Sequence, residues 1–128
     1  MANTRLTQRK QFLYVAKGAR AARSALVVQA RKAVPDHQTI KSGFTATKKT
    51  GNAVQRNRAK RRLRAASYLL LSEIGQPGWD YVFIARKNTA TVKWNQLLDE
   101  TKAALLSLHH NNKNSQSRRF NASNSQKE

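Results

Sequence analysis

The densest run of chemically capable residues lies between Arg56 and Arg64, where six of nine positions are basic. The planar guanidinium of arginine matches phosphate oxygens, and the asparagine in this run can bond a phosphate, a ribose hydroxyl or a base edge. The run contains no acid that could pair with its charges along a helix. It therefore predicts recognition of a polyanion, by Arg56, Asn57, Arg58, Lys60, Arg61, Arg62 and Arg64.

The basic run is predicted to lie on a long helix, from about Val54 to Ile74, because apolar residues recur within it at helical spacing. A Gly-Gln-Pro-Gly sequence at 75–78 ends the predicted helix. The apolar row consists of Ala59, Leu63, Ala66, Leu70 and Ile74. Such a helix is expected to be anchored in a core along this row, with its cationic remainder facing the partner.

Steps of about 100° around this helix place its basic residues along two edges. Arg58 and Arg62 point to one flank, and Arg61 lies at the edge of the other. That second flank, beside the apolar row, carries Arg56, Asn57, Lys60 and Arg64.

A basic loop, residues 48–53, precedes the helix and is expected to be flexible. Backbone amides, the helix dipole and two lysines would all favour an anion there. The glycine spacing does not match the phosphate-binding loop of nucleotide triphosphatases, and an ordinary strand-to-helix turn is the alternative. The candidate residues of this loop are Lys48, Lys49 and Asn52.

Composition narrows the class of partner. The 128 residues suit one domain, and the net charge is +19 with a pI near 11.6. Residues 1–72 hold 17 Lys/Arg against a single acid, Asp36. This imbalance favours nucleic acid over an anionic membrane surface. No apolar run approaches the roughly 20 residues needed to span a bilayer, and no export signal or cysteine is present, so a reducing cytoplasm is expected.

Around the basic helix the sequence predicts an α+β domain, residues 1–108, with helices packed on a sheet in the order α-β-β-α-β-α. A first helix capped by Thr7 is expected to end near Lys17. Strands are expected at 24–31 and 40–47, antiparallel to each other, and at 79–85, where apolar residues on both faces indicate a central strand. Thr91 is expected to cap a last helix. The polar residues 109–128 are expected to be a disordered tail.

Catalytic groups are scarce. His37 lies in a predicted turn, and His109 and His110 lie at the edge of the tail, with no neighbouring acid to orient an imidazole. The acids form no paired cluster typical of a metal-dependent nuclease, so no catalytic residue and no metal ligand is predicted. Most aromatic residues are needed for the core, but Phe12 and Phe44 are candidates for stacking on bases.

Residues 43–64 closely resemble the signature of the protein subunit of bacterial ribonuclease P. The signature is a strand that ends in a lysine pair, followed by G-N-A-V-x-R-N-R-x-K-R-x-x-R, and the match has no gap over 22 residues. Weaker matches span roughly residues 4–108. The resemblance implies a single-domain two-layer fold of order α-β-β-β-α-β-α, like domain 2 of ribosomal protein S5. It also implies a left-handed β-α-β crossover, in place of the right-handed default. The extra strand would have to lie within residues 24–49.

The resemblance also implies a function. In this family an RNA is the catalyst of an endonuclease that removes the 5′ leader of precursor tRNA, with Mg²⁺ held mainly by RNA. The protein assists without catalysing the reaction: its arginine-rich helix contacts the catalytic RNA, and a cleft holds the leader. By position, the RNA-contacting signature corresponds to Lys49, Arg56, Asn57, Arg58, Lys60, Arg61 and Arg64.

The same resemblance places Phe12 in the leader cleft. Phe44, a stacking candidate from the residues alone, is expected in the same cleft. Two positions that are aromatic in some relatives are Ala16 and Val28 here, so leader stacking is expected to be weaker or differently arranged. Two alternatives to the processing role are a structural ribosomal or other RNA-binding protein and a DNA-compacting protein. The signature favours the processing role over the first, and an RNA reader would differ from the second by its use of 2′-hydroxyls and shape.

Overall fold

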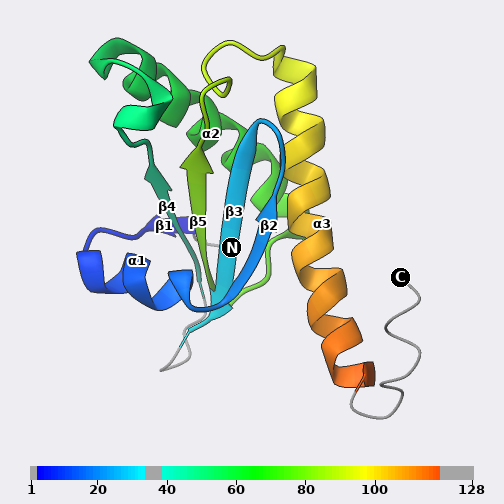
Figure 1. The fold of residues 1–128 in the computed structure, drawn as a ribbon. Coiled ribbons are helices and arrows are strands. Elements are labelled where there is room, and N and C mark those ends of the chain that lie inside the picture. Colours follow the sequence, from blue (N-terminus) through cyan, green and yellow to red (C-terminus); the bar gives the residue numbers. More distant parts are fainter. Residues whose placement is uncertain (1–2, 34–38, 119–128) are drawn as a thin grey trace.

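The computed structural model describes residues 3–33 and 39–118, which form one mixed sheet with helices packed on both faces (Figure 1). The strand order in the sheet is β1-β4-β5-β3-β2. The elements in chain order are β1 (Asn3–Arg5), α1 (Arg9–Ala16), β2 (Ala19–Ala22), β3 (Leu26–Lys32), β4 (Ile40–Thr45), the 3₁₀ helix η1 (Lys48–Thr50), α2 (Ala53–Ile74), β5 (Trp79–Ala85) and α3 (Trp94–Arg118).

Strand β5 lies at the centre of the sheet, as its apolar residues on both faces predicted. It pairs with β3 antiparallel and with β4 parallel. Tyr81 and Phe83 belong to the main core, whereas Val82 packs with Leu6 and Val15 in a second cluster. Because successive side chains of a strand point to opposite faces, β5 supplies both cores of the protein.

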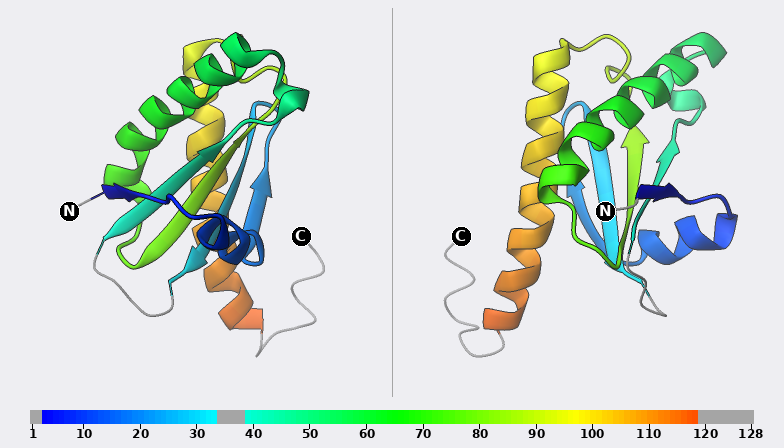
Figure 2. Two further views of the ribbon diagram at one scale, coloured as in Figure 1. Left: turned by 90° about the vertical axis from the view of Figure 1, so that its left-hand side faces the viewer. Right: turned by 180° about the vertical axis from the view of Figure 1, so that it is seen from behind.

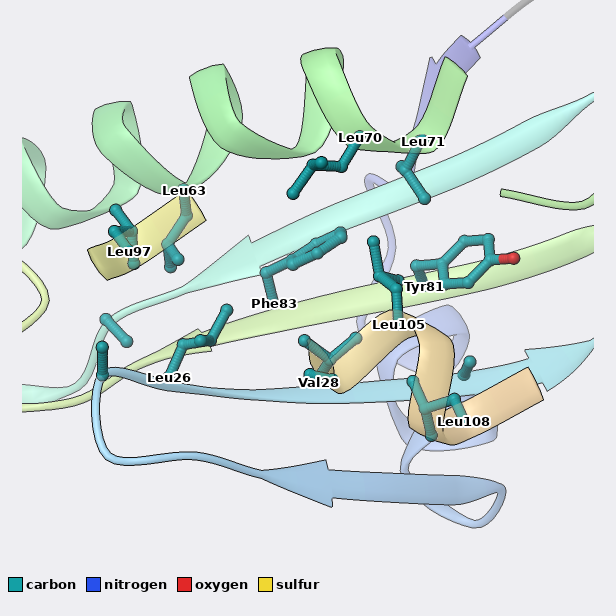
Figure 3. Close-up of a cluster of buried hydrophobic side chains, with 14 of the residues drawn as sticks. Leu26, Val28, Leu63, Leu70, Leu71, Tyr81, Phe83, Leu97, Leu105 and Leu108 are labelled. Carbon is teal, nitrogen blue, oxygen red and sulfur yellow. The ribbon is translucent and has the colours of Figure 1, made fainter. Parts of the chain in front are cut away.

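The main core lies between the sheet and the two long helices, α2 and α3. Leu63, Leu70 and Leu71 of α2 belong to this core together with Leu97, Leu105 and Leu108 of α3 and with Phe83 of the sheet (Figure 3). The apolar row predicted for the basic helix is confirmed, since Ala59, Leu63, Ala66 and Leu70 are buried and Ile74 packs at the edge of the core. Helix α1 covers the opposite face of the sheet (Figure 2).

The connection from β4 through α2 to β5 is left-handed. With both parallel strands pointing upward, as in Figure 1, β5 lies to the right of β4 and α2 runs behind the sheet. Nearly all such connections are right-handed. The resemblance to the ribonuclease P proteins therefore predicted the left-handed connection correctly, whereas the general rule predicts a right-handed one.

Two strands lie where none was expected. β1 pairs parallel with β4 at one edge, and β2 pairs antiparallel with β3 at the other. The additional strand was expected within residues 24–49, but β2 precedes that range. Its sequence, Ala-Arg-Ala-Ala, has little strand propensity, so pairing with β3 decides its conformation. Gly18 permits this close approach, because a Cβ there would lie 2.5 Å from the carbonyl oxygen of Ala30.

The strands expected at 24–31 and 40–47 are present as β3 and β4, but they are not neighbours. β5 lies between them and pairs with both. The helix starts also differ from expectation. Gln8, not Thr7, precedes α1, where its backbone N–H donates to Oε1 of Gln11 (2.9 Å). Helix α3 begins at Trp94, so Thr91 lies too early to cap it.

The last helix extends past residue 108, where the end of the domain was expected. Helix α3 continues to Arg118, and His109 is buried. Nε2 of His109 lies 2.8 Å from the hydroxyl oxygen of Tyr81, which also accepts a hydrogen bond from the backbone N–H of Gln76 (3.0 Å). Burial raises the pKa of Tyr81 to about 12, although the Gln76 hydrogen bond acts in the opposite direction. His109 thus belongs to the domain, whereas His37 and residues 119–128 of the expected tail lie outside the described residues.

Candidate nucleic-acid interface

The segment before α2, where the sequence indicated a loop, forms a 3₁₀ turn at Lys48–Thr50. The hydroxyl of Thr47 accepts a hydrogen bond from the backbone N–H of Lys49 (3.3 Å). Asn52 caps α2: its Oδ1 accepts from the N–H of Gln55 (2.9 Å), and Oε1 of Gln55 accepts from the N–H of Asn52 (2.9 Å). This reciprocal capping uses amides that could otherwise bind an anion. The side chains of Lys48 and Lys49 remain exposed.

One flank of α2 forms a continuous basic strip, which we define as Arg56, Asn57, Lys60, Arg61 and Arg64. Asn57, Arg61 and Arg64 are exposed, and Arg56 and Lys60 are half-buried. Nη1 of Arg56 donates to the carbonyl oxygen of Gly51 (3.0 Å), and the guanidinium of Arg64 lies over the ring of Phe44, 5.5 Å from its centroid. Both contacts fix the direction of these side chains while leaving further N–H donors available.

Arg58 and Arg62 lie on the other flank, as expected, but they bind the protein itself. Nε of Arg58 donates to the carbonyl oxygen of Ala90 (2.8 Å), and Nη1 of Arg62 donates to that of Thr89 (2.6 Å). Arg62 also donates to the carbonyl oxygen of Val92. Burial lowers the pKa of Arg62, and the nearby charge of Arg58 lowers it further. These two arginines therefore hold the segment before α3 against α2.

Acidic residues do not neutralise the basic strip. Within residues 3–33 and 39–118, no carboxylate forms an ion pair with a basic residue of α2. The carboxylate of Glu100 accepts from the backbone N–H of Ala25 (2.7 Å) and from the hydroxyl of Ser24, at the turn between β2 and β3. Burial acts to raise the pKa of Glu100, but hydrogen bonds from Gln96, Ala25 and Ser24 together lower it.

The four residues predicted for a leader cleft do not share one face. Phe12 is half-buried on α1 and lies above Gly43, where a Cβ would come within 2.5 Å of the phenyl Cζ. Ala16 is exposed on the same helix. Val28 is completely buried in the main core, and Phe44 stacks on Phe83 at 5.5 Å, so both point to the opposite face of the sheet. Placing Val28 and Phe44 beside Phe12 was therefore wrong.

Sequence reasoning missed the residues that attach α1 to the sheet. The hydroxyl of Tyr14 donates to the carbonyl oxygen of Lys32 (2.5 Å). Nη1 of Arg31 donates to the carbonyl oxygen of Tyr14 (3.1 Å), and its guanidinium lies 4.1 Å from the centroid of the Tyr14 ring. These contacts join residues 17 and 18 positions apart, so no local pattern could have indicated them.

Arg61 and Arg62 test whether the two flanks of α2 have different roles, one in binding RNA and the other in stabilising the domain. Arg62→Ala is expected to lower the free energy of unfolding by about 2 kcal/mol, because it removes a charged donor from two partly buried carbonyl groups. Arg61→Ala removes the same charge from an exposed site and should change stability by less than ~0.5 kcal/mol. In RNA binding the order reverses: Arg61→Ala should reduce the slope of log affinity against log salt by roughly one. Denaturant unfolding and salt titrations would measure both, and equal effects of the two variants would contradict the assignment.

The described part of the chain holds no group of three or more His, Asp or Glu side chains that could bind a metal ion. Among the same residues, none of the helices combines the length and apolar character needed to cross a membrane.

Comparison with known proteins agrees with this geometry. A family model described as Ribonuclease P matches residues 1–109. The chain is 52% identical over 104 residues to the ribonuclease P protein component of Caulobacter vibrioides, covering 81% of this chain and 70% of that protein. It is 48% identical to the ribonuclease P protein component of Ruegeria pomeroyi, covering 81% and 85%.

Solved structures give the same result at lower identity. The RNase P protein of Staphylococcus aureus superimposes with a TM-score of 0.65 at 28% identity, over 79% of this chain and 91% of that one. The RNase P protein of Thermotoga maritima superimposes with a TM-score of 0.66 at 27% identity, over 79% and 94%. On sequence, fold and the basic helix alike, the chain belongs to the ribonuclease P protein family.

Proposed function

We propose that this chain is the non-catalytic subunit of its endoribonuclease: it binds the catalytic RNA through the basic strip of α2 and assists removal of the 5′ leader from precursor tRNA. The observation that carries the proposal is that the strip meets no carboxylate among the described residues, while the apolar row beside it on the same helix is buried in the core. A cationic strip that meets no carboxylate among the described residues is suited to the phosphates of a folded RNA. Lys48, Lys49 and Asn52 extend this surface at the start of the helix.

We place the leader on the other face of the sheet, beside α1. Phe12 supplies a ring there, and Ala16 leaves the next turn of the helix open. By strand alternation, Gln29 of β3 and Thr45 of β4 lie on this face, and both are only half-buried. The catalytic RNA and the leader would then contact opposite faces of one sheet, so that the protein lies between them.

The described residues do not fit Mg²⁺, since they offer no carboxylate cluster of the kind that holds this ion. We therefore assign the ion to the RNA and derive no step from the protein. Precursor tRNA is made in the bacterial cytoplasm, and we place the chain there.

Reconstitution tests this proposal. The chain alone is expected to cleave no RNA, whereas the chain with a cognate catalytic RNA and low magnesium should produce mature 5′ ends from precursor tRNA faster than the RNA alone. The gain should be larger for a substrate with a leader than for one without. Cleavage by the chain without the catalytic RNA would contradict the assignment of catalysis to the RNA. RNA binding with no gain in processing would instead favour a purely structural role.

A further inference from the structure

A small pocket opens between β1, β4 and α2, on the face of the sheet that α2 covers. Its volume is about 190 Å³, which is below the ~300 Å³ at which sites for drug-sized ligands begin. A pocket of this size suits one planar ring system rather than a larger molecule. Its lining includes Arg5, Ser42, Phe44, Arg64, Ser67 and Tyr68.

The pocket combines aromatic rings with cations. The Phe44 ring is held by stacking on Phe83 with the two planes 17° apart, and the guanidinium of Arg64 lies over it. Tyr68, one helical turn after Arg64, is 73% exposed, which is unusual for a ring of this size. Arg5 lies opposite Ser42 in the parallel register of β1 and β4, so its side chain emerges on the same face.

We propose that this pocket binds one unpaired nucleotide of the catalytic RNA, with the base against Tyr68 and Phe44 and a phosphate at Arg5 and Arg64. The inference rests on the proposed function of α2. Proteins recognise RNA bases mainly where these are unpaired and can stack on aromatic side chains or guanidinium planes. The pocket supplies both kinds of surface, and two arginines complement the charge of the backbone.

The position of the pocket assigns it to the catalytic RNA rather than to the leader. Arg56, Lys60, Arg64 and Tyr68 follow one another at intervals of four residues, or about 6 Å along the helix axis, so the pocket continues the basic strip. Phe12 and the leader site proposed above lie on the opposite face of the sheet. An RNA strand that follows α2 would therefore reach the pocket without crossing the sheet.

Binding of the full-length chain to a cognate catalytic RNA transcript tests the inference. Tyr68→Ala is expected to weaken binding about 5- to 150-fold, which corresponds to the ~1–3 kcal/mol typical of one stacked base. The salt slope should not change, because the tyrosine carries no charge. Tyr68→Phe should bind as the unchanged chain does. Arg5→Ala should lower the salt slope by about one.

Leu69→Ala is the matched control, since Leu69 is apolar, 51% exposed and adjacent to Tyr68 on the same helix, but does not line the pocket. Equal affinities of Tyr68→Ala and Leu69→Ala would overturn the inference. The inference would also be overturned if Tyr68→Ala bound the catalytic RNA normally but the enzyme reconstituted with it lost its preference for substrates with a leader. If replacing the strip residues leaves RNA binding unchanged, the proposed function itself is wrong. This outcome differs from equal affinities of Tyr68→Ala and Leu69→Ala, which would contradict the pocket alone.

Discussion

Replacing Arg56, Lys60 and Arg61 together with alanine is expected to remove three phosphate contacts and to flatten the salt dependence of RNA binding. Each phosphate contact contributes roughly 0.7–0.9 to the slope of log affinity against log salt. Three contacts therefore correspond to a slope change of about 2–2.7. Between 50 and 200 mM salt the unchanged chain should lose about 20- to 40-fold more affinity than the variant. Fluorescence titrations with the catalytic RNA at four or five salt concentrations would measure this difference.

The control for this variant removes the same charge elsewhere. Lys17, Lys32 and Lys102 are exposed and lie outside α2, so their joint replacement with alanine lowers the net charge equally. If the strip makes specific phosphate contacts, the control should shift the slope much less than the α2 variant does. Equal slopes for the two triple variants would mean that a diffuse positive field attracts the RNA, and that α2 has no special role.

The anchored basic helix could be predicted from sequence because its signal is repeated along the chain. Five apolar residues at helical spacing define the row that anchors α2, and the basic residues on both sides of this row indicate a polyanionic partner. Strand β5 was equally clear, since a run of apolar residues without alternation indicates burial on both faces. In both elements the pattern lies within one segment of the chain, so it could be recognised without knowing which other segments pack against it.

What could not be predicted depends on contacts between distant segments. The helical wheel placed Arg58 and Arg62 on the correct flank, but their carbonyl partners lie 27 to 32 residues further along the chain. Placing Val28 and Phe44 in a cleft with Phe12 required the relative register of several strands, which no single strand encodes. Strand β2 owes its conformation to β3, and His109 owes its burial to Tyr81 and Trp79.

Leu63→Ala is expected to cause the largest loss of stability, about 2–5 kcal/mol in the free energy of unfolding. Leu63 is completely buried and lies in the same core cluster as Leu97, Leu26 and Phe83 (Figure 3), so truncation leaves a cavity where α2 meets α3 and the sheet. Domains are commonly stable by only about 5–15 kcal/mol, so the variant should unfold at a much lower denaturant concentration. Leu69→Ala on the same helix is half-exposed and should change stability by less than ~0.5 kcal/mol.

Leu63→Ala also separates the anchoring of α2 in the core from the contacts that α2 makes with RNA. Leu63 does not touch the partner, so its loss should weaken apparent affinity only through the fraction of unfolded chain, and the salt slope should stay the same. Catalytic RNA at 100 times its Kd should in turn return about 2.7 kcal/mol of stability to the chain. If Leu63→Ala instead flattened the salt slope while the domain remained folded, the core would be setting the direction of the basic side chains. The apolar row would then determine RNA recognition as well as stability.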